Sequence, residues 1–394
     1  MPIEPPAEEP PGFAASSSVI SAPALPDEVD ALVLAWSSAQ ARGPEVMVLP
    51  PEGLVLGREM VGFPRGPLRD PRLSREHACI RPSADGWMVE DLGSRNGTRL
   101  DARPVAGPVP FTPGKALRVG GSLLVLTRRL LPEGDVPEDP RLVGESEVAA
   151  ELRRQVADLA PGGDGILLVG AVGVGKGVLT EVLHRFSGRT GPLVSVRCRG
   201  ATPETLARRL LGLVSPDGVV EEGILRRAQR GTLFLDEVTA VPTELQLRLL
   251  RAAEDQRYRP LGALADEEVS VRLVCATAFD PAEAVRSGHL HPKLLEYVEH
   301  KRLDLPPLAA RPEDIPSLAR LLLHRRGEGH RVLRVSLLEA LMGHPWPRNA
   351  RGLADVLGAA VEAAGEREEL ALVPRVETVL RSEERVTPAA FKRP

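Results

Sequence analysis

The chain has 394 residues, of which 43% are apolar and 26% charged, as in ordinary globular proteins. This length predicts two or three domains at about 100–200 residues each. A net charge of −4 argues against an overall basic nucleic-acid-binding surface, and no apolar run reaches the roughly 18 residues of a membrane span. Cys79, Cys198 and Cys275 form no CxxC pair. This argues against a disulfide framework and predicts a cytoplasmic location.

The N-terminal third predicts an all-β domain between two unstructured segments. Residues 1–30 are rich in Pro, Ala and Ser, which predicts disorder. Residues 31–130 contain short strand patterns separated by Gly, Pro, Asp and Asn, which is typical of a β-sandwich. Residues 131–140 carry three prolines and four acids, a linker composition. The strands are predicted at 45–49, 53–58, 78–81, 87–91 and 116–127.

The remainder predicts an α/β domain followed by helices. Residues 141–310 alternate between strand and helix patterns, which predicts a parallel sheet with right-handed crossovers. Residues 311–365 are helical in pattern, and residues 366–394 are too short and proline-interrupted for a three-helix DNA-binding unit. Direct DNA binding and membrane association are therefore not expected. Strands are predicted at 166–170, 193–197, 232–236 and 271–276, and helices at 146–159, 176–185, 203–211, 243–253, 312–325, 336–342 and 349–364.

Three fragments of the predicted sandwich carry residue types that recognise phosphate. Arg58 follows a strand, Ser74 opens the loop SREH, and Asn96 stands in the turn SRNGT. An arginine fork, a hydroxyl donor and an amide donor together suit a phosphate dianion. The ordered set GR, SxxH and NG resembles the forkhead-associated (FHA) domain over about residues 45–129.

The FHA resemblance implies a reader of phosphothreonine peptides. It assigns phosphopeptide contacts to Arg58, Ser74 and Asn96, with Arg75 and Arg95 assisting, and it implies a phosphothreonine-containing protein as partner. His77 is expected to brace the loop rather than touch the ligand. The alternative is a sandwich whose loop polar residues merely form turns.

A second group of residues predicts a nucleotide site. The sequence GAVGVGK, from Gly170 to Lys176, follows an apolar strand and opens a helix, the setting in which backbone N–H groups and a lysine bind phosphates. Gly177 stands where the general motif has a Ser or Thr that reaches Mg²⁺. The strand LFLDE places Asp236 to hold Mg²⁺ through water and Glu237 to polarise the attacking water. The alternative is a glycine-rich turn without a ligand. The nucleotide-binding glycines are predicted to be Gly170, Gly173, Gly175 and Gly177.

These residues and their flanks resemble the AAA+ domain of sigma-54-dependent transcription activators from about residue 141 to 364. The matching stretches are LVGES, GTLFLDE, ELQLRLLR, LPPLAARPEDIPSLA and HPWPRNARGL. The resemblance implies an α/β nucleotide-binding domain over 141–310 and a helical lid over 311–365. It assigns ATP and Mg²⁺ to Lys176, Asp236 and Glu237, and the lid's second-sensor role to Arg351. It also implies a homo-oligomer, or a hetero-oligomer with related activators.

The chain departs from that family at positions used for hydrolysis and for the sigma factor. The family's GAFTGA loop is absent from residues 211–222. The first-sensor Asn is Ala278, and the Asn that restrains the catalytic Glu is Arg197. The arginines presented to the neighbouring subunit align with His291 and Tyr297, and an arginine finger contributes on the order of 10³–10⁵ in rate.

The sequence therefore favours a phosphothreonine-reading, ATP-binding regulator with weak or absent ATPase activity and a vestigial Glu237. Two alternatives stay open at this point. One is an active AAA+ ATPase that drives sigma-54 transcription, and the other is a non-enzymatic phosphopeptide adaptor. The histidines of the HxH sequence at His289 and His291 are expected to be solvated, because structural zinc usually needs four ligands.

Overall fold

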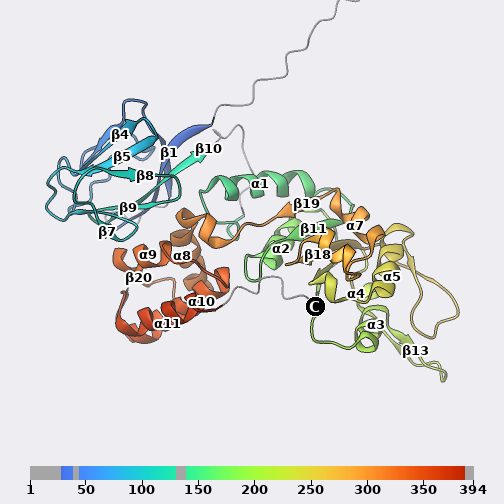
Figure 1. The fold of residues 1–394 in the computed structure, drawn as a ribbon. Coiled ribbons are helices and arrows are strands. Elements are labelled where there is room, and N and C mark those ends of the chain that lie inside the picture. The colour runs from blue at the N-terminus through green and yellow to red at the C-terminus, as the bar shows by residue number, and fades with distance from the viewer. Residues whose placement is uncertain (1–27, 39–43, 130–138, 387–394) are drawn as a thin grey trace, which may run out of the picture.

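Two facing sheets form the N-terminal part of the protein (Figure 1). The computed structural model describes residues 28–38, 44–129 and 139–386. The predictions of a disordered N-terminus and of a linker fall almost entirely outside the described residues. The first sheet has the order β2-β1-β10-β9-β6-β7, and the second has the order β3-β4-β5-β8. The strands are β1 (Val29–Ser37), β2 (Glu45–Val48), β3 (Leu54–Leu56), β4 (Ala78–Ser83), β5 (Gly86–Asp91), β6 (Thr98–Leu100), β7 (Arg103–Pro104), β8 (Val109–Phe111), β9 (Ala116–Val119) and β10 (Ser122–Arg129).

Strands β1 and β10 pair in the centre of the first sheet and are buried on both faces. Along β10, Leu124 and Leu126 point into the sandwich core, whereas Leu123 and Val125 belong to an apolar cluster shared with C-terminal helices. Successive side chains of a strand alternate between faces, so a strand covered on both sides reads as a continuous apolar run. The sequence analysis did not predict β1, and it joined β9 and β10 into one strand. Gly120, with φ +59°, forms the turn between them.

A five-stranded parallel sheet with the order β12-β15-β18-β11-β19 forms the second domain. The predicted strands 193–197 and 232–236 and the predicted helix 203–211 are confirmed residue for residue. The strands are β11 (Ile166–Val169), β12 (Leu193–Arg197), β15 (Thr232–Asp236), β18 (Arg272–Thr277) and β19 (Arg302–Asp304). The helices are α1 (Glu147–Leu159), α2 (Lys176–Phe186), α3 (Pro203–Leu211), α4 (Ile224–Arg227), α5 (Thr243–Glu254), α6 (Pro281–Arg286) and α7 (Pro292–Glu299).

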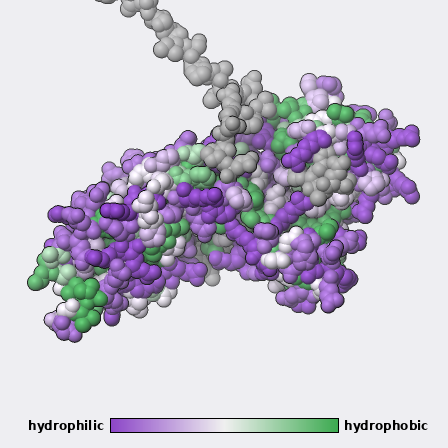
Figure 2. Space-filling view, turned by 180° about the vertical axis from the view of Figure 1, so that it is seen from behind, coloured by the Kyte–Doolittle hydropathy of each residue, from purple (hydrophilic) through white to green (hydrophobic). Residues whose placement is uncertain are grey.

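Two short hairpins project from one end of this domain (Figure 1). The first is β13 (Leu213–Val214) with β14 (Val220–Glu221), and the second is β16 (Arg257–Tyr258) with β17 (Glu267–Glu268). A bridge between Leu213 and Leu261 joins the two hairpins. Figure 2 shows apolar surface at this end, where Val219, Val220 and Leu264 are exposed.

The last described residues form a helical lid of α8 (Ile315–Arg325), α9 (Val335–Met342), α10 (Asn349–Ala364) and α11 (Pro374–Glu384). Strands β20 (Val332–Leu333) and β21 (Glu369–Leu370) pair in parallel between them. The predicted helix 349–364 is confirmed. Helix α11 was not predicted, because Pro374 was taken as an interruption. It stands in the first turn of α11, where its missing N–H costs nothing.

The lid packs directly against the outer face of the first sandwich sheet (Figure 1). Trp36 and Val125 of the sandwich share one buried cluster with Ile315 of α8 and Leu338 of α9. The guanidinium of Arg320 lies 4.2 Å from the centre of the Trp36 ring, a cation–π contact. The lid therefore shields one face of β1 and β10 from water.

Charged groups border this apolar contact. The buried carboxylate of Glu339 on α9 lies 2.8 Å from Nη1 of Arg118 and 3.2 Å from Nε of Arg99. On the other side of the contact, Glu313 is buried beside the sandwich strands. Burial, together with the neighbouring carboxyl of Asp314, raises the pKa of Glu313 to about 7. Ion pairs and apolar packing together hold the lid against the sandwich.

Replacing Glu339 by Gln should lower the midpoint of thermal unfolding of the full chain. The change removes the charge that two partly buried arginines share, and hydrogen bonds to charged groups are worth about 1.5–3 kcal/mol. Glu377→Gln is the matched control, because its pair with Arg381 is long and exposed and should contribute at most about 1 kcal/mol. Equal midpoints for the two variants, measured by calorimetry, would contradict this account of the interface.

Candidate functional site

The three sandwich fragments that carry Arg58, Ser74 and Asn96 meet on one exposed surface. The Arg58 side chain donates to the carbonyl of Leu73 through Nε (3.1 Å) and Nη2 (2.8 Å). The hydroxyl of Ser74 accepts from the backbone N–H of Arg95 at 3.1 Å. The amide of Asn96 donates to the carbonyl of Arg72 at 2.7 Å. The structure thus brings Arg58, Ser74, Arg95 and Asn96 together, and Arg75 lies exposed on the same loop.

Buried side chains beneath this surface hold its loops in place through hydrogen bonds. His77 is fully buried, and its Nδ1 accepts from the N–H of Ser74 while Nε2 lies 3.2 Å from the carbonyl of Gly97. This confirms the prediction that His77 braces the loop. Asp91 accepts from Ser94 and Thr98. Burial opposes the charged form of Asp91, but these hydrogen bonds outweigh it and lower its pKa.

The sequence analysis missed further residues of this surface. Arg69 lines a small depression with Arg58, and its backbone N–H donates to the Arg58 carbonyl. Arg69 has φ +47°, a left-handed conformation that no sequence pattern announces. Gly57 is also required here, because a Cβ at that position would lie 1.8 Å from the carbonyl oxygen of Arg75.

A second site opens between the parallel sheet and the lid, with a volume of about 920 Å³. The loop from Gly170 to Gly175 connects β11 to α2, and its residues 172–175 line the cavity with Lys176, Gly177, Asp236, Glu237 and Arg351. Asp236 ends β15 and Glu237 follows it, so they lie at the carboxyl edge of the sheet, where ligands of open α/β sheets bind. The structure therefore gathers the predicted residues around one cavity, except Gly170, whose carbonyl accepts from Lys176.

Lys176 lies folded back along its own loop. Its Nζ donates to the carbonyl of Gly170 at 2.6 Å and lies 3.6 Å from the carboxylate of Glu237. Burial lowers its pKa, and the charges of Glu237 and Asp236 act in the opposite direction. Glu237 has φ +63°, a strained conformation for a side chain other than glycine, of the kind that gathers at functional sites.

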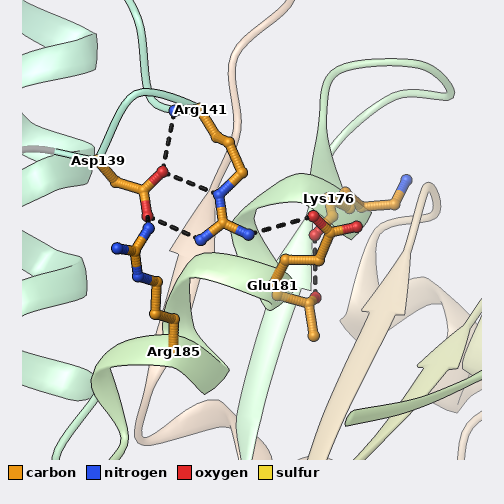
Figure 3. A network of polar contacts seen from close by, with 6 residues as sticks. Asp139, Arg141, Lys176, Glu181 and Arg185 are labelled. Carbon is orange, nitrogen blue, oxygen red and sulfur yellow. Dashed lines mark hydrogen bonds and ion pairs between the residues drawn. The ribbon is translucent and has the colours of Figure 1, made fainter. Parts of the chain in front are cut away.

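The segment that enters the domain is tied to the helix of the phosphate loop (Figure 3). Asp139 accepts from Arg141 at 2.7 and 2.9 Å and from Arg185 at 3.3 Å. Hydrogen bonding to Arg141 lowers the pKa of Asp139 to about 2. Arg141 also reaches Glu181 of α2 at 3.4 Å. In Figure 3 the side chain of Lys176 extends away from this network.

The lid contacts the phosphate loop through one backbone hydrogen bond and one side-chain hydrogen bond. The N–H of Ala350 donates to the carbonyl of Gly173 at 3.2 Å, and the amide of Asn349 donates to the carbonyl of Val172 at 3.0 Å. Asn349 also accepts from the N–H of Leu308. Its buried side chain thus joins three segments, a role that the sequence analysis missed because the partners lie far apart along the chain.

The positions aligned with the family's trans-acting arginines have structural roles. The ring Nδ1 of His291 accepts from the N–H of Lys293 and caps α7. The ring of Tyr297 lies against Gly165, where a Cβ would come within 2.5 Å of it. Among the described residues, no three His, Cys, Asp or Glu side chains are grouped as metal ligands.

The family comparisons agree with this geometry. The FHA domain model matches residues 54–120, and the sigma-54 interaction domain model matches residues 142–304. The chain carries both an FHA domain and a sigma-54 interaction domain. It is an FHA β-sandwich followed by an α/β P-loop domain, as predicted. No helix in the described part of the chain could cross a membrane.

Individual relatives are transcription regulators matched over part of their length. The sigma-54-dependent regulator UacR of Escherichia coli is 33% identical over 235 residues, which are 57% of this chain and 39% of UacR. NorR1 of Cupriavidus necator is 36% identical over 248 residues, 60% of this chain and 48% of NorR1. The structure of NtrX from Brucella abortus in complex with ATP shows 30% identity and a TM-score of 0.53, covering 57% of this chain and 51% of NtrX. The chain spans about half the length, or less, of these relatives.

A Gly173→Ala substitution should separate the effect of lid closure from that of backbone strain. A Cβ at Gly173 would lie 2.3 Å from the carbonyl oxygen of Arg348, which adds about 1–3 kcal/mol of overpacking to the cost of a left-handed alanine. Gly188→Ala is the matched control, because Gly188 has φ +69° and nothing within 4 Å, so only about 1–2 kcal/mol is expected. Denaturant titration of both variants measures the difference, and an equal loss of stability would refute the close lid contact.

Proposed function

We propose that this protein is a regulator that reads phosphothreonine peptides through its sandwich and binds ATP between its phosphate loop and its lid, with little or no hydrolysis. The observation that carries the proposal is the cavity in which Lys176, Asp236, Glu237 and the lid residue Arg351 meet. The ATP complex of the related NtrX supports the same choice of nucleotide. The exposed cluster of Arg58, Ser74 and Asn96 supports the phosphopeptide role.

ATP would be held by charge and by backbone donors. The helix α2 directs its free N–H groups and the positive end of its dipole toward the phosphates. The ammonium group of Lys176 would leave the carbonyl of Gly170 and donate to a phosphate oxygen instead. Because the phosphate is charged, the buried ammonium group would gain a charge–charge attraction. If the nucleotide arrives with Mg²⁺, Asp236 is the carboxylate that would reach the ion through water. Gly177 offers the ion no hydroxyl, and Glu237 is already paired with Lys176, so the set of metal ligands is sparse.

Hydrolysis would be slow because the groups that accelerate it are missing. Ala278 has no amide for the γ-phosphate, and His291 and Tyr297 are committed to their own domain. Loss of an arginine finger lowers the rate by on the order of 10³-fold or more. A site that holds ATP for long periods suits a conformational switch, in homo-oligomers or together with related activators.

Lys176→Ala should abolish ATP binding in calorimetry, because it removes the cation that meets the phosphates. Glu237→Gln should leave steady-state turnover almost unchanged, since there is little hydrolysis to lose. An active ATPase would instead turn over near one per second and fall sharply in Glu237→Gln. Absence of ATP binding by the wild type would favour the pure adaptor.

Arg58→Ala should weaken binding of a phosphothreonine peptide about tenfold or more, because each hydrogen bond to a charged group is worth about 1.5–3 kcal/mol. Arg81→Ala is the control, an exposed arginine of the same domain on β4. Calorimetry against phosphorylated and unphosphorylated forms of a peptide library measures the effect. Since Arg58 also braces its loop, the unfolding midpoints of both variants must be compared. Equal affinity of the wild type for the two peptide forms would refute the reader.

A further inference from the structure

Unpaired positive charge accumulates around the nucleotide cavity. Seven cationic and four acidic side chains line it. Arg141 is neutralised by Asp139 and Glu181, and Arg311 lies beside Asp314. The side chains of Arg197, Arg199, Arg325 and Arg351 make no hydrogen bond or ion pair with other described residues. This excess of unpaired positive charge favours a ligand that carries several negative charges.

Arg197 lines the nucleotide cavity at the carboxyl edge of the sheet. It ends β12, directly in register with Asp236 at the end of the neighbouring strand β15. The carboxyl edge of the sheet thus presents a guanidinium beside the two acids. Although the two residues are neighbours in the sheet, the structure has no ion pair between Arg197 and Asp236, so the arginine charge remains available to a ligand.

Ligands for a divalent cation are correspondingly few. Magnesium requires close to octahedral oxygen coordination and usually takes one or two carboxylates besides the phosphates. Gly177 contributes no oxygen from its side chain, and Glu237 lies 3.6 Å from Lys176. Of Asp236, which ends β15, and Glu237, which follows it, only Asp236 is left for a cation, and Arg197 stands in register with it on β12.

We propose that Arg197 and its neighbour Arg199 neutralise the triphosphate in place of a divalent cation, so that this protein binds ATP without magnesium. The proposal rests on the proposed binding of ATP. It specifies which side chains offset the negative charge of the nucleotide. Free ATP carries more negative charge than its magnesium complex. A guanidinium fork binds phosphate oxygens in two parallel hydrogen bonds and stays charged at every physiological pH. The metal-free nucleotide therefore matches this cavity.

Titration calorimetry of the full chain with ATP, once in excess magnesium and once in excess EDTA, tests the proposal. The two affinities should differ by less than about tenfold, which is about 1.4 kcal/mol. A larger loss in EDTA would overturn the inference and leave the proposed ATP binding intact. Absence of binding in both conditions would refute ATP binding itself, and the inference with it.

Variants then assign the effect to Arg197. Arg197→Gln should weaken binding in EDTA about tenfold or more and weaken it less in magnesium, where the metal supplies charge. Arg381→Gln on α11, an arginine outside the cavity, should change neither affinity. If Arg197→Gln binds like the wild type in EDTA with an unchanged unfolding midpoint, the role of Arg197 is refuted.

A gain of metal dependence completes the test. A Cβ at Gly177 would meet only the Phe234 ring, at 4.0 Å, so Gly177→Ser can be accommodated. Combined with Arg197→Gln, it should give a site that binds ATP at least about tenfold more tightly in magnesium than in EDTA. If the double variant still binds ATP with similar affinity in magnesium and in EDTA, the metal-free binding does not depend on Arg197 and Gly177.

Discussion

The close approach of the lid backbone to the phosphate loop is the constraint on which the nucleotide cavity depends. Gly173 lies so near the Arg348 carbonyl that no side chain fits, and Asn349 fastens the loop at Val172. These contacts bring the lid residue Arg351 to the same cavity as Lys176. Without them, the cavity would lose one wall and its arginine. The backbone hydrogen bond between Ala350 and Gly173 therefore helps to place charged side chains of the sheet and of the lid at one cavity.

The lid contacts both the nucleotide cavity and the sandwich. Helix α8 lines the cavity with Leu318 and Arg325 and meets Trp36 of the sandwich through Arg320. On the sandwich, the loop that leads to Ser74 is anchored to the β9–β10 turn, because Asp70 accepts from Gly121. Any rotation of the lid relative to the sheet would therefore move the sandwich with it.

The sequence was sufficient where the physical signal is local. The strand, glycine loop and helix around Lys176 could be placed because apolar runs, glycines and a helix start lie within about twenty residues of one another. Strand β1 escaped prediction because both of its faces are covered, which removes the alternating pattern. The convergence of Arg118 and Arg99 on Glu339 bridges more than 200 residues, and no local pattern encodes it. Of the arginines around the cavity, Arg351 was predicted to bind nucleotide and Arg197 was singled out, whereas Arg199, Arg311 and Arg325 were missed because only the tertiary fold brings them there.

Positions that depart from the relatives' pattern form a consistent set in this structure. His291 caps a helix and Tyr297 packs beside the first strand of the sheet, so both side chains stabilise the domain that carries them. Arg197 places a cation at the carboxyl edge of the sheet, in register with Asp236. Cationic side chains of this one chain therefore line the cavity. A fixed guanidinium can hold a phosphate, but it cannot activate water as a metal does. A cavity lined by guanidinium groups is thus suited to holding a phosphate rather than to activating water.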